Sequence, residues 1–382
     1  MSPSTSESRP LPARPDPTRE HVAPVAPHGS ERARSPPLAG GGPGDNLPPR
    51  MAASSSSFDV NRGRRSIVNA EYSPRSHRSR RTMDQATVAP LSGRVAVVTG
   101  GTSGLGREVA VGLAGQGATT VIVGRGRDRV AQVAAEIAKA TGNRSVESVA
   151  VTDLALRAET AAVGRVLLER YARIHVLVNN AGAYLARRET TSEGLERTFA
   201  LNVLSPFLLT SLLVPRLTES APARVVNVAS AAHQRNSVDF SDLQSAHRYG
   251  GFRAYGRSKL ELLLLTREFA RRLQGTGVSV NAVHPGFVAT GFGLNNGGGF
   301  ALGMRVVMAL FARNVRRGAA VPLFAATDPS VGARTGLYLV DRHISPGSAS
   351  SRDLVVAGRL YEVCRELTGA PEVPQRVPAP AP

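Results

Sequence analysis

Short apolar segments alternate with helical patterns from about residue 88 to residue 283, and this alternation constrains the fold more than any other feature of the chain. The strand-like segments, rich in β-branched residues, lie at 94–99, 119–123, 146–151, 174–179, 224–228 and 278–283. The helical patterns lie at 107–113, 163–171, 201–213 and 260–273. Because the strands are largely apolar along their length, both faces of their sheet must be covered. The sequence therefore predicts one α/β domain over residues 89–382, built on a doubly wound parallel sheet of the Rossmann type.

Residues 1–88 have a different composition. They hold 13 of the 26 prolines and no lysine, and they show no sustained period of either a strand or a helix. Such a segment cannot bury enough apolar surface to offset the entropy lost on ordering, so we predict a disordered tail. Met83 opens a segment that looks like a start just before the folded part. Two interpretations of the upstream stretch stay open: a misassigned start, or a loose basic tail that contacts a partner or a membrane surface.

Composition narrows the classes of function. The formal net charge is +18, but 45 of the 47 basic residues are arginine, a skew typical of a GC-rich genome. Since no aromatics are interleaved with the basic residues and no binding motif is present, we expect no specific nucleic-acid partner. The single cysteine, Cys364, excludes a disulfide framework and a multi-cysteine zinc site, and we expect no metal. Without a signal peptide or an apolar stretch long enough to span a membrane, we predict a cytoplasmic protein.

The first strand runs into a glycine-rich turn, Thr99-Gly100-Gly101-Thr102-Ser103-Gly104-Leu105-Gly106, just before the first helical pattern. Glycines at such a junction let the backbone approach a pyrophosphate that lies at the helix N-terminus. The spacing of Gly100, Gly104 and Gly106 departs from G-x-G-x-x-G. A tight turn without a ligand would use the same residues, so the turn alone does not decide the function.

This turn matches the TGxxxGxG turn of the short-chain dehydrogenase/reductase family, which the chain resembles. The other motifs of that family follow in its order, as Asp153-Leu154, Asn179-Asn180-Ala181-Gly182, Asn202, Ser230, Tyr255-Gly256-Arg257-Ser258-Lys259, Pro285-Gly286 and Thr290. The stretch between Ser230 and Tyr255, and several C-terminal segments, resemble the retinol-dehydrogenase-like branch, so the similarity covers about residues 92–369. Members of that branch act on retinoids, steroids, lipid aldehydes and other carbonyls, which leaves the substrate class open.

The resemblance implies a catalytic set of Asn202, Ser230, Tyr255 and Lys259. A tyrosine with an ordinary pKa of about 10 is a poor base at neutral pH, and a nearby cation lowers that pKa. Tyr255 and Lys259 stand at i and i+4, adjacent on one helix face, so we expect the lysine to lower the pKa of the tyrosine. The resemblance further implies that Ser230 donates to the substrate carbonyl and that Asn202 holds a water. A serine that caps a turn and a solvent-facing asparagine are the plain alternatives.

The end of the second strand predicts the cofactor. An NAD enzyme needs an acidic residue there for the ribose hydroxyls, but Val123-Gly124-Arg125 offers none. An arginine can pair with a 2′-phosphate, so we predict NADP(H), with Arg125 as the discriminating residue and Arg127 as a weaker candidate. An arginine that merely solvates a loop is the alternative. The predicted cofactor contacts are Thr99, Gly100, Thr102, Ser103, Gly104, Leu105, Gly106, Arg125, Asp153, Leu154, Asn180, Ala181, Gly182, Tyr255, Lys259, Pro285, Gly286, Val288 and Thr290.

A substrate lid is predicted at about residues 291–318. The Asn-Asn-Gly-Gly-Gly run at 295–299 would act as a hinge beside an apolar helix that ends near Phe311, which suits a flap over an apolar substrate. A packed core helix, or a helix resting on a membrane surface, explains the same pattern. We interpret His233, His247 and His284 as structural or pocket-lining, since they lack the spacing of metal ligands.

The function predicted from these features is an NADP(H)-dependent oxidoreductase that transfers a hydride between the nicotinamide and a carbonyl or alcohol of a small apolar substrate. Tyr255 would be the proton donor or acceptor. Two alternatives stay open: a protochlorophyllide-type C=C reductase, and a scaffold that binds NADP(H) without turnover. The sequence leaves homo-oligomer formation and peripheral membrane contact open.

Overall fold

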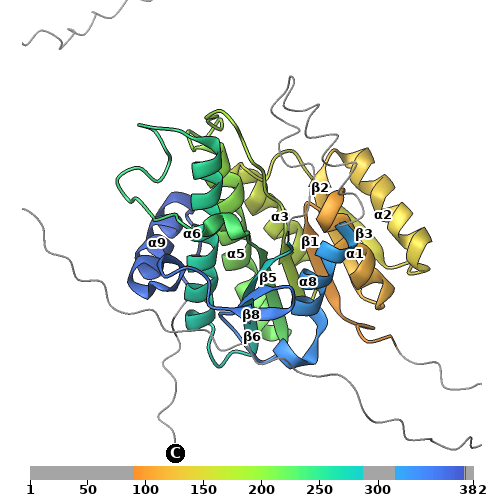
Figure 1. The fold of residues 1–382 in the computed structure, drawn as a ribbon. Helices are drawn as coiled ribbons and strands as arrows, with labels where there is room; N and C mark the ends of the chain where they lie inside the picture. Colours follow the sequence, from red (N-terminus) through yellow and green to blue (C-terminus); the bar gives the residue numbers. More distant parts are fainter. Residues whose placement is uncertain (1–88, 287–314, 374, 376–382) are drawn as a thin grey trace, which may run out of the picture. The chain divides into compact units, whose positions relative to one another are not determined.

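The computed structural model describes residues 89–286, 315–373 and 375 (Figure 1). Four predictions lie wholly or mostly outside the described residues: the tail at 1–88, Val288, Thr290, and the predicted lid up to residue 314. The last residues of the predicted lid, 315–318, are described. They begin helix α8 (Val315–Thr327), which packs against α1 (Gly104–Gly115). The two helices are close at Gly112, because a Cβ there would lie 2.4 Å from the Leu323 side chain.

The sheet has eight strands in the order β3-β2-β1-β4-β5-β6-β7-β8, with all neighbours parallel except the antiparallel pair β7–β8. The strands are β1 (Val95–Thr99), β2 (Thr119–Arg125), β3 (Val146–Val151), β4 (Val176–Asn179), β5 (Ala223–Val228), β6 (Val278–His284), β7 (Tyr338–Val340) and β8 (His343–Ser345). The six predicted strands are therefore confirmed. The last two were not predicted, because each is only three residues long.

Helices cover both faces of the sheet, as the apolar strands require (Figure 1). Besides α1 and α8, they are α2 (Arg127–Thr141), α3 (Arg157–Arg170), α4 (Arg197–Phe199), α5 (Ser205–Glu219), α6 (Gly251–Arg272) and α9 (Leu354–Thr368). Within β1, Val97 belongs to the core under α3, α5, α6 and α9, whereas its neighbours Ala96 and Val98 belong to the core under α1, α2 and α8. This alternation confirms a doubly wound α/β fold.

One long helical stretch, Arg197–Glu219, joins α4, a π-helical turn (Ala200–Leu204) and α5. Its length and its mean hydropathy of 1.6 would suit a membrane span, but 78% of its apolar window is buried inside the fold. It therefore serves as a core helix. A π-helical turn widens the helix locally and often marks a functional site, and here it carries Asn202.

The helix α6 is enclosed on nearly all sides, and α9 covers one of them. Arg272, at the end of α6, is only 5% exposed. It donates to Glu268 (2.8 Å), to Glu362 on α9 (2.9 Å) and to the carbonyl oxygen of Val373 (3.0 Å). Its guanidinium also lies 3.7 Å from the centre of the Tyr361 ring. The C-terminal part of the described chain is thereby fixed to α6.

Candidate active site

The glycine-rich turn is tied to the end of β4. The Thr99 hydroxyl accepts from the backbone N–H groups of Asn180 (3.0 Å) and Ala181 (3.1 Å). In return, the side-chain amide of Asn180 donates to the carbonyl oxygens of Thr99 (3.0 Å) and Gly100 (3.3 Å). The predicted cofactor residues at 99–100 and 180–181 therefore meet at the carboxyl ends of β1 and β4, where parallel α/β sheets bind ligands.

The turn also has the close packing that a pyrophosphate cradle needs. A Cβ on Gly106 would lie 2.3 Å from the Gly100 carbonyl oxygen and 2.4 Å from the amide nitrogen of Asn180, so only glycine fits. Gly104 begins α1 with a φ of 51°, and the side chain of the N-cap residue Ser103 makes no capping hydrogen bond. The first N–H groups of α1 lack a side-chain cap, which suits an anion. The residues present therefore fit the phosphates of a dinucleotide.

Arg125 lies at the carboxyl end of β2, beside this turn. A Cβ on the preceding Gly124 would lie 2.4 Å from the Thr102 methyl group, which shows how closely the strand end approaches the turn. Arg125 is exposed, and its side chain forms neither a hydrogen bond nor an ion pair within the described part of the chain. Its guanidinium is therefore available to an anionic group. Arg127, the other candidate, is also exposed, on the first turn of α2.

Asp153 follows β3, and its carboxylate is already bonded. One oxygen accepts from Arg197 at 2.6 Å and the other accepts from the backbone N–H of Ala155 at 2.9 Å. Leu154 is 6% exposed and belongs to the core. Sequence reasoning missed Arg197, because nothing distinguishes it from the many other arginines of the chain. Any contact of Asp153 with a cofactor stays a prediction.

Tyr255, Ser230 and Lys259 come together at the carboxyl end of β5. Ser230 stands just beyond that strand, its hydroxyl accepts from the Ala232 N–H (3.2 Å), and its side chain hydrogen-bonds to Tyr255. Lys259 is 4% exposed, donates to the carbonyl oxygen of Val228 (2.9 Å), and lies 5.6 Å from the centre of the Tyr255 ring. Ser230 thus both caps a turn and contacts the tyrosine.

The pKa of the tyrosine moves in the direction opposite to our expectation. Burial raises the pKa of Tyr255 to about 12, and the hydrogen bond with Ser230 opposes this only in part. Burial lowers the pKa of Lys259 to about 8. The expected lowering of the Tyr255 pKa is therefore not seen, because desolvation outweighs the hydrogen bond with Ser230. The phenol keeps its proton at neutral pH.

Asn202 uses its side-chain amide to hold other parts of the site. Its oxygen accepts from the Ala183 N–H (2.9 Å), and its nitrogen donates to the Ala183 carbonyl (3.0 Å) and to the Ser258 hydroxyl (3.0 Å). A Cβ on Gly182 would lie 3.1 Å from the Asn202 amide oxygen and 3.3 Å from the Lys259 ammonium, so both groups border the same glycine. The structure therefore brings Asn202 to the site, where it braces the segment after β4 against α6. Its role with water stays a prediction.

Comparison with known proteins agrees with this geometry. Residues 94–296 match the family described as short chain dehydrogenase. The chain belongs to the short-chain dehydrogenase/reductase family. It is 37% identical to human retinol dehydrogenase 11 over 281 residues, which cover 74% of this chain and 87% of that one. The retinol-dehydrogenase-like resemblance is thus confirmed, and the chain is an oxidoreductase by family.

Two solved structures from bacteria share the fold. An uncharacterized protein from Mycobacterium paratuberculosis has a TM-score of 0.62 and 28% sequence identity, and the match covers 76% of this chain and 98% of the other. The RhlG/NADP active-site complex from Pseudomonas aeruginosa has a TM-score of 0.51 and 29% identity, covering 66% and 96%.

The three histidines differ in environment. His233 is fully buried, His284 at the end of β6 is partly buried, and His247 is exposed. Burial lowers the pKa of both His233 and His284. Among the residues that the structure describes, no group of three histidine, cysteine or acidic side chains could hold a metal ion. Their interpretation as structural or pocket-lining residues agrees with these positions.

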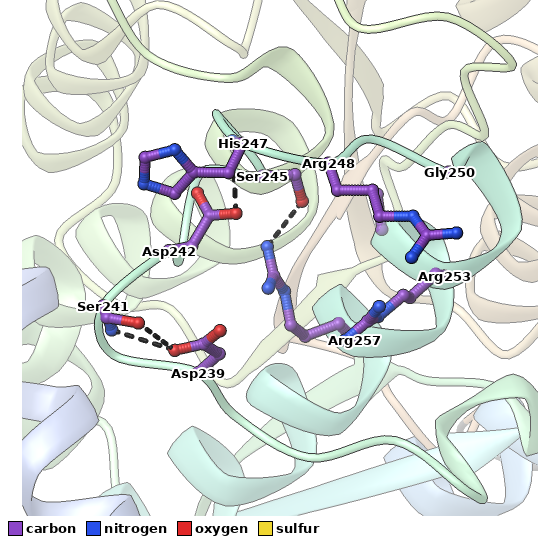
Figure 2. Close-up of a pocket in the computed structure, with 10 residues that line it drawn as sticks. Asp239, Ser241, Asp242, Ser245, His247, Arg248, Gly250, Arg253 and Arg257 are labelled. Atoms are coloured by element: carbon purple, nitrogen blue, oxygen red, sulfur yellow. Dashed lines mark hydrogen bonds between the residues drawn. The ribbon is translucent and has the colours of Figure 1, made fainter. Parts of the chain in front are cut away.

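A polar pocket of about 230 Å³ lies beside α6, between its first turns and the loop before it (Figure 2). It is lined by Asp239, Ser241, Asp242, Ser245, His247, Arg248, Gly250, Arg253, Ala254 and Arg257. The last four follow the spacing of one helix face, whereas Tyr255 and Lys259 follow the spacing of another. This pocket is therefore distinct from the site at Tyr255 of this short-chain dehydrogenase/reductase.

Proposed function

We propose that this chain is an NADP(H)-dependent oxidoreductase that transfers a hydride between the nicotinamide and a carbonyl or alcohol of an apolar substrate. The observation that carries the proposal is the convergence of Tyr255, Ser230 and Lys259 at the carboxyl end of β5, the same edge of the sheet as the glycine-rich turn. Arg125 supports the choice of NADP(H), as does the NADP in the RhlG complex. The names of relatives such as retinol dehydrogenase 11 support an apolar substrate of the retinoid kind.

The site residues divide the work of carbonyl reduction. The bound nicotinamide supplies the hydride. Ser230 and Tyr255 donate hydrogen bonds to the carbonyl oxygen and stabilise the negative charge that develops there. Tyr255 then gives its proton to that oxygen, a role that its raised pKa of about 12 permits throughout the neutral range. The Lys259 ammonium, protonated below about pH 8, offsets the charge left on the phenolate.

The two alternatives lack comparable support. For the C=C reductase, a cysteine near the site would be the expected extra feature, but Cys364 is fully buried on α9. A scaffold without turnover would not need the hydrogen-bonded pair of Ser230 and Tyr255, since binding a nucleotide needs no proton donor. Cytoplasmic localisation stays a prediction from the sequence.

Thermal stabilisation by four nucleotides tests the proposal without a guess about substrate. A ligand at 100 times its dissociation constant adds about 2.7 kcal/mol of stability, which raises the melting temperature measurably. We expect NADPH and NADP to raise it and NADH and NAD to leave it unchanged. Retinal and a medium-chain aldehyde, followed through the nicotinamide absorbance, then test turnover. Stabilisation by NADH alone would overturn the cofactor assignment, and binding without turnover on any carbonyl would favour the scaffold.

Lys259 predicts an alkaline limit to carbonyl reduction. Its lowered pKa of about 8 means that it is charged below this pH and neutral above it, whereas Tyr255 stays protonated well beyond it. We therefore expect kcat at saturating NADPH to fall as the pH rises through about 8. Lys259→Arg keeps its charge and should lose this limb, although its kcat will be lower. Lys139→Arg, at the chain's other lysine, should leave the profile unchanged. If the kcat of Lys259→Arg falls with rising pH as it does in the wild type, a group other than Lys259 causes the fall.

A further inference from the structure

His233 connects the catalytic serine to a distant part of the chain. Its side chain is fully buried, with Nδ1 2.7 Å from the carbonyl oxygen of Ser230 and Nε2 3.2 Å from the backbone nitrogen of Ser348. Its ring packs edge-on against Tyr338, with ring centres 5.2 Å apart. The residues that His233 joins are more than a hundred positions apart in the sequence, so this link forms only in the folded protein.

The two hydrogen bonds fix the protonation of the ring. The Ser348 N–H can only donate, so Nε2 of His233 must accept and carries no proton. Nδ1 therefore bears the hydrogen of the neutral ring and donates it to the Ser230 carbonyl. Burial of the side chain lowers the pKa of His233, which agrees with a neutral ring. An imidazolium would present a second donor to the Ser348 N–H.

Besides the hydrogen bond of its side chain with Tyr255, Ser230 is held by two bonds from its own turn. Its carbonyl oxygen also accepts from the backbone N–H of His233, but at 3.3 Å, and its hydroxyl accepts from the Ala232 N–H at 3.2 Å. Both donors belong to the single three-residue turn Ala231–His233. The 2.7 Å bond from the His233 ring is the shortest of the three. The ring is also the only one of these three donors that is bonded outside the turn, to Ser348.

The partner segment is itself held against α6. Arg267 on α6 donates to the carbonyl oxygen of Pro346 (2.9 Å), and the carbonyl oxygen of Ser348 accepts from the Ser351 hydroxyl (2.7 Å). Gly347 has a φ of 71°, and a Cβ there would lie 2.6 Å from the Ser351 hydroxyl. Residues 346–351 therefore give His233 a fixed support.

We propose that His233 is a positioning residue, which holds the Ser230 peptide against residues 346–351 so that the serine hydroxyl meets the substrate carbonyl. This inference rests on the proposed function. The charged and titratable groups that face His233 are Arg267 from α6, His284 from β6 and Tyr338 from β7. Burial raises the pKa of Tyr338 to about 12, so that phenol stays neutral. Protonation of His233 at acid pH would break the bond to Ser348 and lower kcat.

Three histidine variants test this role, with reduction of retinal by NADPH as the assay. His233→Phe keeps an aromatic ring but loses both hydrogen bonds, and we expect kcat to fall roughly 10- to 100-fold because a small misplacement of a reacting group has that effect. His233→Asn has an amide nitrogen near the position of Nδ1, so it should recover part of the loss. Stabilisation by NADPH should persist in both, and the decline of kcat at acid pH should disappear. His343→Asn, at an exposed histidine, is the matched control.

The outcomes separate this inference from the proposed function. If Ser230→Ala lowers kcat while His233→Phe stays within about twofold of the wild type, His233 does not position the serine. If His233→Phe does not fold, His233→Asn decides alone: an unchanged kcat and an acid decline like that of the wild type would also overturn the inference. If Ser230→Ala and Tyr255→Phe both keep the wild-type kcat, the proposed function fails instead.

Discussion

Tyr255→Phe should lower kcat for carbonyl reduction by roughly 10²- to 10⁴-fold, the usual contribution of a positioned proton donor. The substitution removes only the hydroxyl that hydrogen-bonds to Ser230 and leaves the ring that packs edge-on against Tyr184, with ring centres 6.3 Å apart. The fold and the nucleotide cradle should therefore survive. Initial rates with retinal at saturating NADPH measure the loss, and the melting temperature with NADPH shows that the variant still binds.

Tyr171→Phe is the matched control for this experiment. Its hydroxyl donates to Glu147 at 2.6 Å, at the opposite end of the sheet from Tyr255, and the residue is 7% exposed. Losing that bond should cost about 1 kcal/mol of stability without changing kcat. A Tyr255→Phe enzyme that turns over within a few-fold of the wild type would show that another group supplies the proton. A saturated carbonyl product from an unsaturated substrate would favour C=C reduction.

Arg125→Asp should reverse the order of cofactor affinities. The wild-type guanidinium can form charge-assisted hydrogen bonds with a 2′-phosphate, each worth about 1.5–3 kcal/mol, so their loss predicts NADPH binding weaker by about tenfold to a hundredfold or more. An aspartate would repel the phosphate and accept hydrogen bonds from the ribose hydroxyls of NADH. Dissociation constants for NADPH and NADH, measured by titration on both proteins, give the two ratios.

Arg144→Asp supplies the comparison that this experiment needs, because it changes the net charge equally. Arg144 is exposed and precedes β3, so it lies at the amino ends of the strands, whereas Arg125 lies at the carboxyl end of β2. We expect Arg144→Asp to leave both affinities unchanged and Arg127→Asp to have a smaller effect than Arg125→Asp. If Arg125→Asp, Arg127→Asp and Arg144→Asp lose NADPH affinity equally, the loss comes from the change in net charge and not from a contact at Arg125. Unchanged NADPH affinity in Arg125→Asp would remove Arg125 from the cofactor site.

The parallel sheet could be predicted because its strands carry their own signal, whereas the site depended on resemblance and on contacts between distant residues. The runs at 94–99 and 278–283 are apolar enough to be recognised alone. The meeting of Ser230 with Tyr255 follows from no local pattern. For α6, the prediction began near residue 260 but the helix begins at Gly251, because glycines and arginines hide the periodicity of its first turns.

Burial and long-range contacts account for what the sequence could not show. The expectation for the Tyr255 pKa considered only the neighbouring lysine, since the spacing of two residues says nothing about how much solvent surrounds them. The ion pair of Asp153 with Arg197 and the bond between His233 and Ser348 join residues 44 and 115 positions apart. Asn202 was predicted within a helix, but the widened π-helical turn that carries it gives no sequence signal of its own.

The enclosure of α6 by α9 has a consequence for synthesis on the ribosome. Arg272 finds two of its partners in Glu362 and Val373, which are translated about a hundred residues later than α6. Until those residues emerge, the nascent chain exposes one apolar side of the helix that carries Tyr255 and Lys259. A premature stop codon before α9 would therefore disable the protein although every residue of the catalytic set had been translated.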